Sequence, residues 1–249
     1  QAAKQLDGTP FTLYRMGEEG VPTINEFLAQ NMKEGQILGF DGRVVNALAG
    51  EKMESELAQK GVSVKYQNDL VGEIWKDRPE LSKEPVWILD EKYTGCSASN
   101  KIAQREKMKE YDATAHILTT VDDIVWLLNI RGNDVPCNPI VLSYAVVTMD
   151  QLYLFIQKET LNDEVRGYLE GLGIEIRPYD SVYEFVSQMK DEKVLLERGK
   201  INYAIDKNLD VSNVKINKMN PTALAKAIKN PVEVENQRKA HIKDGVAVT

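Results

Sequence analysis

The sequence predicts an α/β protein made of two successive units, for three reasons. Segments that alternate apolar and polar residues, as strands do, follow one another with amphipathic helical segments between them. A stretch rich in proline and charge, residues 78–85, is typical of a linker and separates the two units. In the second unit, two apolar runs at 141–147 and 152–156 are joined by a four-residue turn, which predicts an antiparallel hairpin and therefore a mixed sheet.

The first unit shows two clear helix starts. Thr23 and Glu26 have the spacing of a capping box in front of an apolar run. Asn46 is a residue type that caps helices through its side chain. In order, we expect a strand at 11–15, a helix after Thr23, a buried strand at 36–41, a helix from Asn46 to about Gln59, a strand at 61–66 and a short helix at 69–75.

The second unit is expected to alternate helices and strands around its hairpin. Asp122 and Asp123 stand in a first helical turn, where carboxylates complement the helix dipole. Asn220 followed by Pro221 is a typical helix start. In order, we expect a helix from Ser97 or Ser99 to Tyr111, a strand at 113–118, a helix from Thr120, a loop at 129–139, the hairpin, a helix at 161–172, a strand at 174–177, a helix at 181–189, a strand at 193–196, a helix at 221–228 and a final helix from Pro231.

Composition excludes several classes of protein. The chain of 249 residues is 43% hydrophobic and 28% charged, which suits packed domains and excludes disorder. A net charge of −7 without a basic stripe weighs against nucleic acid as a partner. No apolar run approaches the roughly 20 residues that cross a bilayer, so no membrane partner is expected. Cys96 and Cys137 are too few for a disulfide scaffold and suit a reducing cytoplasm.

The residue types that usually perform catalysis do not form a familiar constellation. His116 lies inside a predicted strand and is expected to be a core or edge histidine, and His241 on the final helix is expected to be solvated or at an interface. Asp122 and Asp123 are adjacent in a helix, so their side chains diverge by about 100° and are not expected to share a proton or a metal. Cys137 has no visible base beside it. We therefore predict no catalytic and no metal-ligating residue in this chain.

The most informative segment is Trp126–Pro139. A loop this rich in Gly, Asn, Asp and Pro, placed between a helix and a buried strand, holds a defined backbone. Arg131 within it is able to grip a carboxylate with two parallel hydrogen bonds. The alternative is a loop in which Arg131 pairs with its own neighbour Asp134. From the residues alone, both interpretations remain open.

Over essentially its whole length the chain resembles the Xaa-Pro aminopeptidase (aminopeptidase P) family, of the three-domain cytosolic type, in the creatinase and prolidase superfamily. The resemblance is carried by Val121–Pro136 with Asn138-Pro139, by Asn220–Asn230, by Arg238–Ala247 and by Ile74–Pro79. It implies two creatinase-N-terminal-like domains, each a mixed β-sheet flanked by helices. Residues 1–82 would be the C-terminal half of the first domain and 83–229 the second. Residues 230–249 would be the first helix of a missing metallopeptidase domain of pita-bread fold.

The resemblance also implies a function. The chain would be the non-catalytic N-terminal portion of a metal-dependent enzyme that removes the N-terminal residue preceding proline, and would contribute substrate access, domain docking and dimer assembly. Two divalent metals, usually manganese, would belong to the missing catalytic domain, with no cofactor in this chain. The partners would be that domain, a second subunit in a homodimer, and peptides with an N-terminal X-Pro sequence. Arg131, Asn133 and Asn138 would shape the substrate entrance, and the enzyme would be cytoplasmic.

Both ends of the sequence look cut. The family carries an Asp-Gly-Arg-Tyr motif just before the helix that contains Gln1–Gln5, and Asp41-Gly42-Arg43 follows a later strand and does not match that site. A second interpretation is a stand-alone binding or interaction module with the same fold and no peptidase activity. The coding sequence downstream of Thr249 distinguishes the two. A third, a small-molecule enzyme, lacks the convergent catalytic groups it needs.

Overall fold

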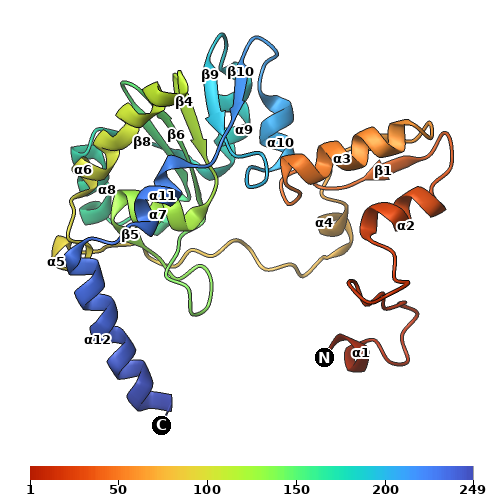
Figure 1. Cartoon of the computed structure of the whole chain (residues 1–249), viewed down its shortest axis with the longest axis horizontal. Helices are drawn as coiled ribbons and strands as arrows, with labels where there is room; N and C mark the ends of the chain where they lie inside the picture. The colour runs from red at the N-terminus through yellow and green to blue at the C-terminus, as the bar shows by residue number, and fades with distance from the viewer. Residues whose placement is uncertain (249) are drawn as a thin grey trace.

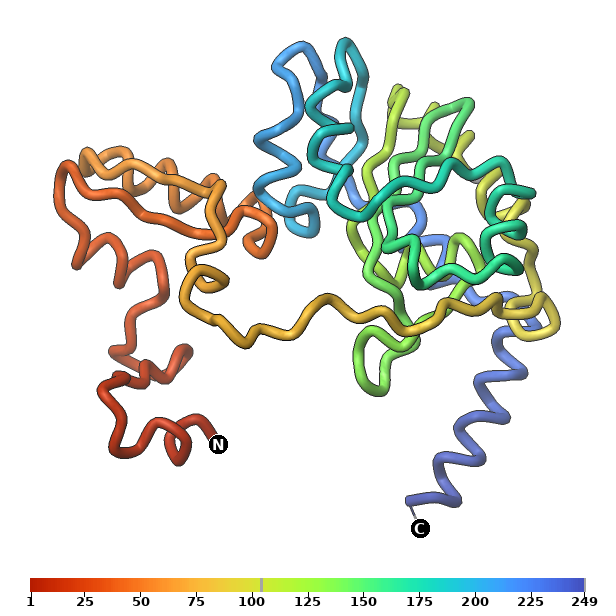
Figure 2. The backbone as a smooth tube through the Cα atoms, turned by 180° about the vertical axis from the view of Figure 1, so that it is seen from behind, coloured from red at the N-terminus to blue at the C-terminus, as the bar shows by residue number. Residues whose placement is uncertain are grey.

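Two units lie side by side in the computed structural model, which describes residues 1–248 apart from the side chain of Gln104 (Figure 1). Thr249, the last residue of the predicted third segment, lies outside the described residues. As predicted, no helix or strand forms over residues 78–85, and this stretch runs from one unit to the other (Figure 2). The first unit contains α1 (Ala2–Gln5), α2 (Ile24–Asn31), β1 (Ile37–Gly39), α3 (Ala47–Ala58), β2 (Ser63–Lys65) and α4 (Leu70–Ile74).

The predicted helix starts of the first unit are confirmed. Thr23 accepts from the backbone N–H of Glu26, whose carboxylate accepts from the backbone N–H of Thr23 at 2.8 Å, so the capping box is complete. Asn46 caps α3 by accepting from the backbone N–H of Ala49 at 2.9 Å. These bonds satisfy backbone donors that an α-helix cannot satisfy itself.

Two strand predictions in the first unit are wrong. Residues 11–15 form no strand, and Phe11 is 71% exposed, because no strand of the described chain lies beside this segment to complete its hydrogen bonds. The predicted strand at 36–41 shortens to β1, and Ile37 is 50% exposed rather than buried. Among the described residues β1 pairs with β2 alone, in parallel, and a two-stranded sheet is marginally stable by itself.

The second unit is built on a six-stranded mixed sheet of order β10-β9-β4-β6-β7-β8, which confirms the mixed sheet expected from the hairpin. β6 runs antiparallel to both β4 and β7, while the β7–β8, β4–β9 and β9–β10 pairs are parallel. Its elements are β3 (Trp87–Ile88), α5 (Glu91–Thr94), α6 (Ala98–Ile102), a 3-10 helix (Ala103–Tyr111), β4 (Ala115–Leu118), α7 (Val121–Leu128), β5 (Ile130–Arg131), β6 (Ser143–Thr148), β7 (Leu152–Ile156), α8 (Asp163–Gly171), β8 (Ile174–Pro178), α9 (Val182–Gln188), β9 (Lys193–Leu196), α10 (Tyr203–Asn208), β10 (Val214–Asn217), α11 (Pro221–Ala227) and α12 (Pro231–Val248), with short 3-10 turns at Lys158–Thr160 and Tyr179–Ser181.

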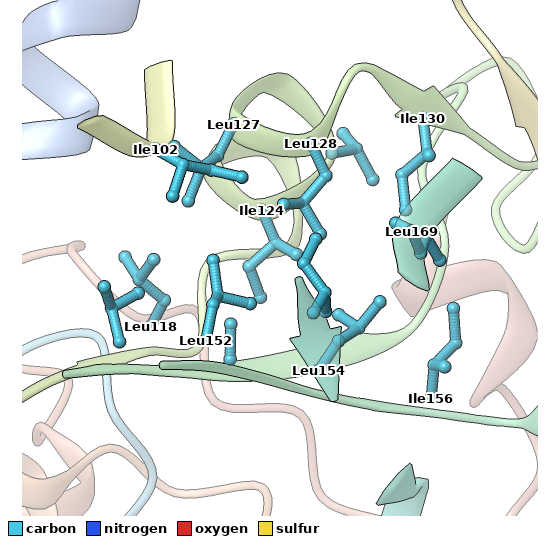
Figure 3. Packing of buried hydrophobic residues seen from close by; sticks show 14 of the residues in the cluster. Ile102, Leu118, Ile124, Leu127, Leu128, Ile130, Leu152, Leu154, Ile156 and Leu169 are labelled. Carbon is cyan, nitrogen blue, oxygen red and sulfur yellow. The ribbon is translucent and has the colours of Figure 1, made fainter. Parts of the chain in front are cut away.

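Helices cover both faces of this sheet, so alternate residues of its central strands enter two different cores. On one face α7 and α8 bury Ile124 and Leu169 against Leu154 of β7, as Figure 3 shows. On the other face Phe155, the next residue of β7, packs with Val186 of α9. The sheet is therefore the fixed frame from which the surrounding loops project.

The two units meet where α3 packs on α10. Tyr203 is fully buried there, its ring contacts Phe40 and Tyr66 of the first unit, and its hydroxyl donates to Glu54 of α3 at 2.7 Å. A Cβ at Gly50 would come within 2.2 Å of the Tyr203 ring, so only glycine allows this approach. Neither α10 nor β10 was expected from the sequence.

α12 begins at Pro231 as predicted and projects from the second unit with no buried residue along its described length (Figure 1). Its first turns contact α5. Asn230 donates to the carbonyl oxygen of Thr94 at 2.8 Å, and Asn236 donates to that of Tyr93 at 3.2 Å. The helix is thus held at its base against α5.

Candidate functional site

The loop that the sequence singled out begins where α7 ends. Asn129 closes α7 in the left-handed conformation, with φ of 52°. The chain then pairs as β5 with β3, with Arg131 opposite Trp87. Gly132 lies against the segment that returns toward β6, and a Cβ there would meet the carbonyl oxygen of Ile140 at 2.9 Å. This close approach fixes the position of Arg131 relative to the end of the loop.

The tip of the loop is a tight turn. The backbone N–H of Asn138 donates to the carbonyl oxygen of Val135 at 3.1 Å, with Pro136 second and Cys137 third in the turn. Cys137 has a φ of 63°, the value required at the third position of a type II turn and favoured by Gly or Asn. Asp134 braces the base of the loop by accepting from the backbone N–H of Leu142 at 2.7 Å.

Arg131 does not pair with Asp134. Its Nη1 donates to the carbonyl oxygens of Val125 at 2.8 Å and Ile130 at 2.7 Å. Burial lowers the pKa of this guanidinium below its ordinary value, against the opposing charge of Glu233. The interpretation in which Arg131 neutralises its own loop is therefore wrong, because Asp134 is used by the backbone instead.

Arg131 and Asn138 line one open pocket of about 350 Å³ between α7, the loop and the base of α12. Asn133 is exposed and lies outside that pocket. The structure therefore brings together two of the three residues expected at a substrate entrance. The other polar and aromatic residues that line the pocket are Tyr93, Thr94, Asp122, Trp126, Lys226, Lys229, Glu233, Asn236 and Gln237.

Sequence reasoning missed a buried lysine beneath this pocket. Lys101 is 1% exposed, and its Nζ donates to Oδ1 of Asn129 at 2.6 Å and to the carbonyl oxygen of Trp126 at 2.9 Å. The ammonium also lies 4.2 Å from the centre of the Trp126 ring. Burial lowers the pKa of Lys101 to about 8. Its neighbours in the sequence carry no signal for this, since its partners come from α7 and the residue that ends it.

Trp126 connects this lysine to α12. Its indole N–H donates to Oε1 of Glu233 at 3.2 Å, and the other oxygen of Glu233 accepts from the backbone N–H of Asn230 at 3.0 Å. Asn230 in turn accepts from the backbone N–H of Glu233 at 3.0 Å, which makes a reciprocal cap for the helix. Through Glu233, the end of α7 and the start of α12 form one wall of the pocket.

The two adjacent aspartates both contact one lysine, which the sequence did not indicate, and the expectation that they share no metal or proton is not affected. Lys226 of α11 contacts the carboxylates of both Asp122 and Asp123, at 2.7 Å in the case of Asp123. Asp123 is buried and also accepts from Asn220 at 2.7 Å. The side chains diverge as helix geometry requires, but the long and flexible lysine reaches both. This network attaches α11 to α7.

The remaining candidates stay apart. His116 is 4% exposed in β4, as expected for a core histidine, and burial lowers its pKa to about 4. His241 is exposed on α12. Within residues 1–248, no three side chains of His, Cys, Asp or Glu gather as a metal site would require. None of the helices in the same range combines the length and apolar character needed to cross a membrane.

Comparisons with known proteins agree with this architecture. Residues 77–233 match the family model of the creatinase/prolidase N-terminal domain. Xaa-Pro aminopeptidase app-1 of Caenorhabditis elegans is 34% identical over 257 residues, covering 100% of this chain and 42% of the worm protein. Xaa-Pro aminopeptidase 1 of Dictyostelium discoideum is 33% identical over 260 residues, covering 100% of this chain and 41% of that protein.

The similarity extends to a solved structure. The crystal structure of X-prolyl aminopeptidase from Caenorhabditis elegans, a cytosolic enzyme with a di-nuclear active site, superposes with a TM-score of 0.91 at 33% identity. The match covers 100% of this chain and 42% of that one. This chain thus spans less than half the length of the curated relatives it matches. The chain belongs to the creatinase/prolidase N-terminal domain family.

Proposed function

We propose that this chain is the non-catalytic N-terminal portion of a metal-dependent Xaa-Pro aminopeptidase. The observation that carries the proposal is that all of the chain, but only 42% of the worm enzyme, takes part in a superposition with a TM-score of 0.91. In this proposal the longer polypeptide removes the N-terminal residue in front of proline in the cytoplasm.

The reaction itself belongs to residues outside this chain. The worm enzyme has a di-nuclear active site, whereas the described residues of this chain offer no group of three metal-ligating side chains. We place the two divalent metals, with manganese as the expected ion, in a catalytic domain that begins after residue 229. This chain would contribute substrate access, docking of that domain and assembly of a homodimer.

The start of α12 supports the docking role. Residues 230–249 would form the first helix of the catalytic domain, 83–229 the second domain and 1–82 the C-terminal half of the first. Glu233 and Asn230 attach this helix to Trp126 and Thr94, so its direction is set by the second domain. A domain that begins with α12 would therefore be oriented relative to the second domain by these contacts.

The loop supports the access role. Arg131 and Asn138 line the pocket at the base of α12, and Asn133 is exposed beside them. The loop and α12 project from the same end of the second unit, in both views of the chain (Figures 1 and 2). Catalytic residues in a domain that follows α12 would therefore lie on the same side of the molecule as the tip of this loop.

Kinetics of the longer polypeptide test the proposal. We expect it to hydrolyse X-Pro peptides, and Arg131→Ala to lower kcat/KM by about tenfold for an X-Pro tripeptide, the loss expected for one charge-assisted contact. Arg166→Ala, which removes an arginine outside the pocket, is the matched control. Failure of the longer polypeptide to release N-terminal residues would contradict the function. Unchanged kinetics in Arg131→Ala, with unchanged stability, would contradict the access role alone.

A further inference from the structure

One edge of the Arg131 guanidinium is free of protein partners. Nη1 is held by the carbonyl oxygens of Val125 and Ile130. Nε and Nη2, which form the edge that matches a carboxylate, donate to no acceptor among the described residues of the chain. Arg198 provides the contrast, because its guanidinium pairs with Glu51 at 2.9 Å and with Asp206 at 3.2 Å.

The guanidinium of Arg131 is partly buried, and it forms no ion pair with the described residues of the chain. Burial lowers the pKa of its guanidinium, and the charge of Glu233 opposes that effect. The described residues include no ion pair between Arg131 and Glu233. The two oxygens of Glu233 already accept from Trp126 and Asn230. A partly buried cation without a bound anion costs stability, so an arrangement of this kind is expected where a ligand supplies the anion.

The surroundings of Arg131 suit a small anionic ligand. The pocket volume of about 350 Å³ lies within the roughly 300–1,000 Å³ of small-molecule sites. Lys229 lines the same pocket, and its Nζ contacts a backbone carbonyl rather than a carboxylate. Lys226 is already neutralised by Asp122 and Asp123. Two cationic side chains of the pocket, Arg131 and Lys229, are therefore available to an anion.

We propose that the Nε–Nη2 edge of Arg131 binds a carboxylate, and that this carboxylate is the C-terminal group of a short peptide. The planar fork of arginine matches the two oxygens of a carboxylate, and its other nitrogen, fixed by the main chain, keeps the fork oriented before the ligand arrives. Asn138 and Trp126 offer polar and aromatic contacts to the adjoining peptide. The identification of a peptide as the molecule that bears the carboxylate rests on the proposed function. The identification of a carboxylate-binding site at Arg131 does not rest on it.

Binding of tripeptides to the 249-residue chain tests this inference. The probes are Ala-Pro-Ala with a free C-terminal carboxylate and the same peptide as its C-terminal amide, titrated at about pH 7 by calorimetry. We expect the acid to bind about tenfold more tightly than the amide, as one charge-assisted bidentate contact predicts. Arg131→Gln should reduce this preference to less than about twofold.

Three further measurements keep the test decisive. Arg166→Gln should keep the preference, and Arg131→Lys, which retains a charge but loses the fork, should weaken it; thermal unfolding checks that each variant folds. The amide of Ala-Pro-Glu tests a side-chain carboxylate as the source, and its tighter binding than Ala-Pro-Ala amide also supports the site. Equal binding of acids and amides by the wild-type chain, or a preference that survives Arg131→Gln, overturns the inference. Absence of peptidase activity in the longer polypeptide would leave these results unaffected.

Discussion

Replacing Gly50 with alanine should destabilise the protein, although the same change in most exposed helices stabilises it. Gly50 lies inside α3, where an added methyl group would normally contribute about 0.5–1 kcal/mol through helix propensity. Here the new Cβ would stand 2.2 Å from Cδ2, 2.6 Å from Cγ and 2.7 Å from Cε2 of Tyr203. Tyr203 is fully buried and its hydroxyl is bonded to Glu54, so its ring cannot turn away freely.

The size of the effect comes from these two opposing contributions. Overpacking a buried contact costs about 1–3 kcal/mol, and a Cβ 2.2 Å from a ring carbon belongs in the upper part of that range, so a net loss of about 1–2 kcal/mol remains after the propensity gain. For a chain of this size, that loss lowers Tm by about 2–8 °C. The damage should be concentrated at the junction of the two units, because Gly50 belongs to the first and Tyr203 to the second.

Gly167 provides a matched control. It lies in α8, and no atom stands within 4 Å of the position its Cβ would take, so Gly167→Ala should raise Tm slightly. Thermal unfolding of the two variants, followed by circular dichroism, measures both signs in one experiment. A Gly50→Ala variant as stable as Gly167→Ala would refute the packing of α3 on Tyr203, and with it the junction of the two units.

Three other changes have expected outcomes of their own. Burial lowers the pKa of Lys101 to about 8, so between pH 8 and 10.5 the unfolded chain binds a proton that the folded chain does not. The free energy of unfolding of the wild type, measured with urea, should therefore rise with pH relative to that of Lys101→Met by on the order of 1–3 kcal/mol. Parallel pH profiles of the two proteins would contradict this. Asn230→Ala removes the cap of α12 and the bond to Thr94, and should cost about 1–2 kcal/mol, seen as faster hydrogen exchange in the first turns of α12; unchanged exchange would show that other contacts hold the helix. The φ of Cys137 is 63°, a value that glycine adopts freely and β-branched residues avoid, so Cys137→Gly should leave Tm unchanged or raise it. Cys137→Val should lower Tm, by about 2–4 °C for each kcal/mol of backbone strain. A valine variant as stable as the wild type would contradict the turn.

Local signals in the sequence were sufficient for many helix starts and for the central hairpin. Thr23, Asn46 and Asn220 each cap the helix that the sequence assigned to them, because a cap depends on residues only two or three positions away. The alternation at 11–15 misled, because a strand also needs a partner strand and none of the described chain provides one. α10 escaped notice because its buried Asp206 is neutralised by Arg198 and Lys215, which come from outside that helix.

The candidate site divides in the same way. The polar composition of the loop is enough to single out Arg131 and Asn138, and both line the pocket. Lys101 and Glu233 could not be found from sequence, since they meet at Trp126 from 25 and 107 residues away. The partner of Arg131 was also undecidable, because its acceptors are backbone carbonyl oxygens, of Val125 and Ile130, whose positions depend on the fold rather than on residue type.

The most direct test of the account is the activity of the purified 249-residue chain beside that of the longer polypeptide that we propose it belongs to. Both are incubated with manganese and an X-Pro peptide, and release of the N-terminal residue is measured. We predict release by the longer polypeptide and none by the chain alone, since our proposal places the catalytic ligands beyond residue 229. Manganese-dependent release by the chain alone, or none by the longer polypeptide, would contradict the account.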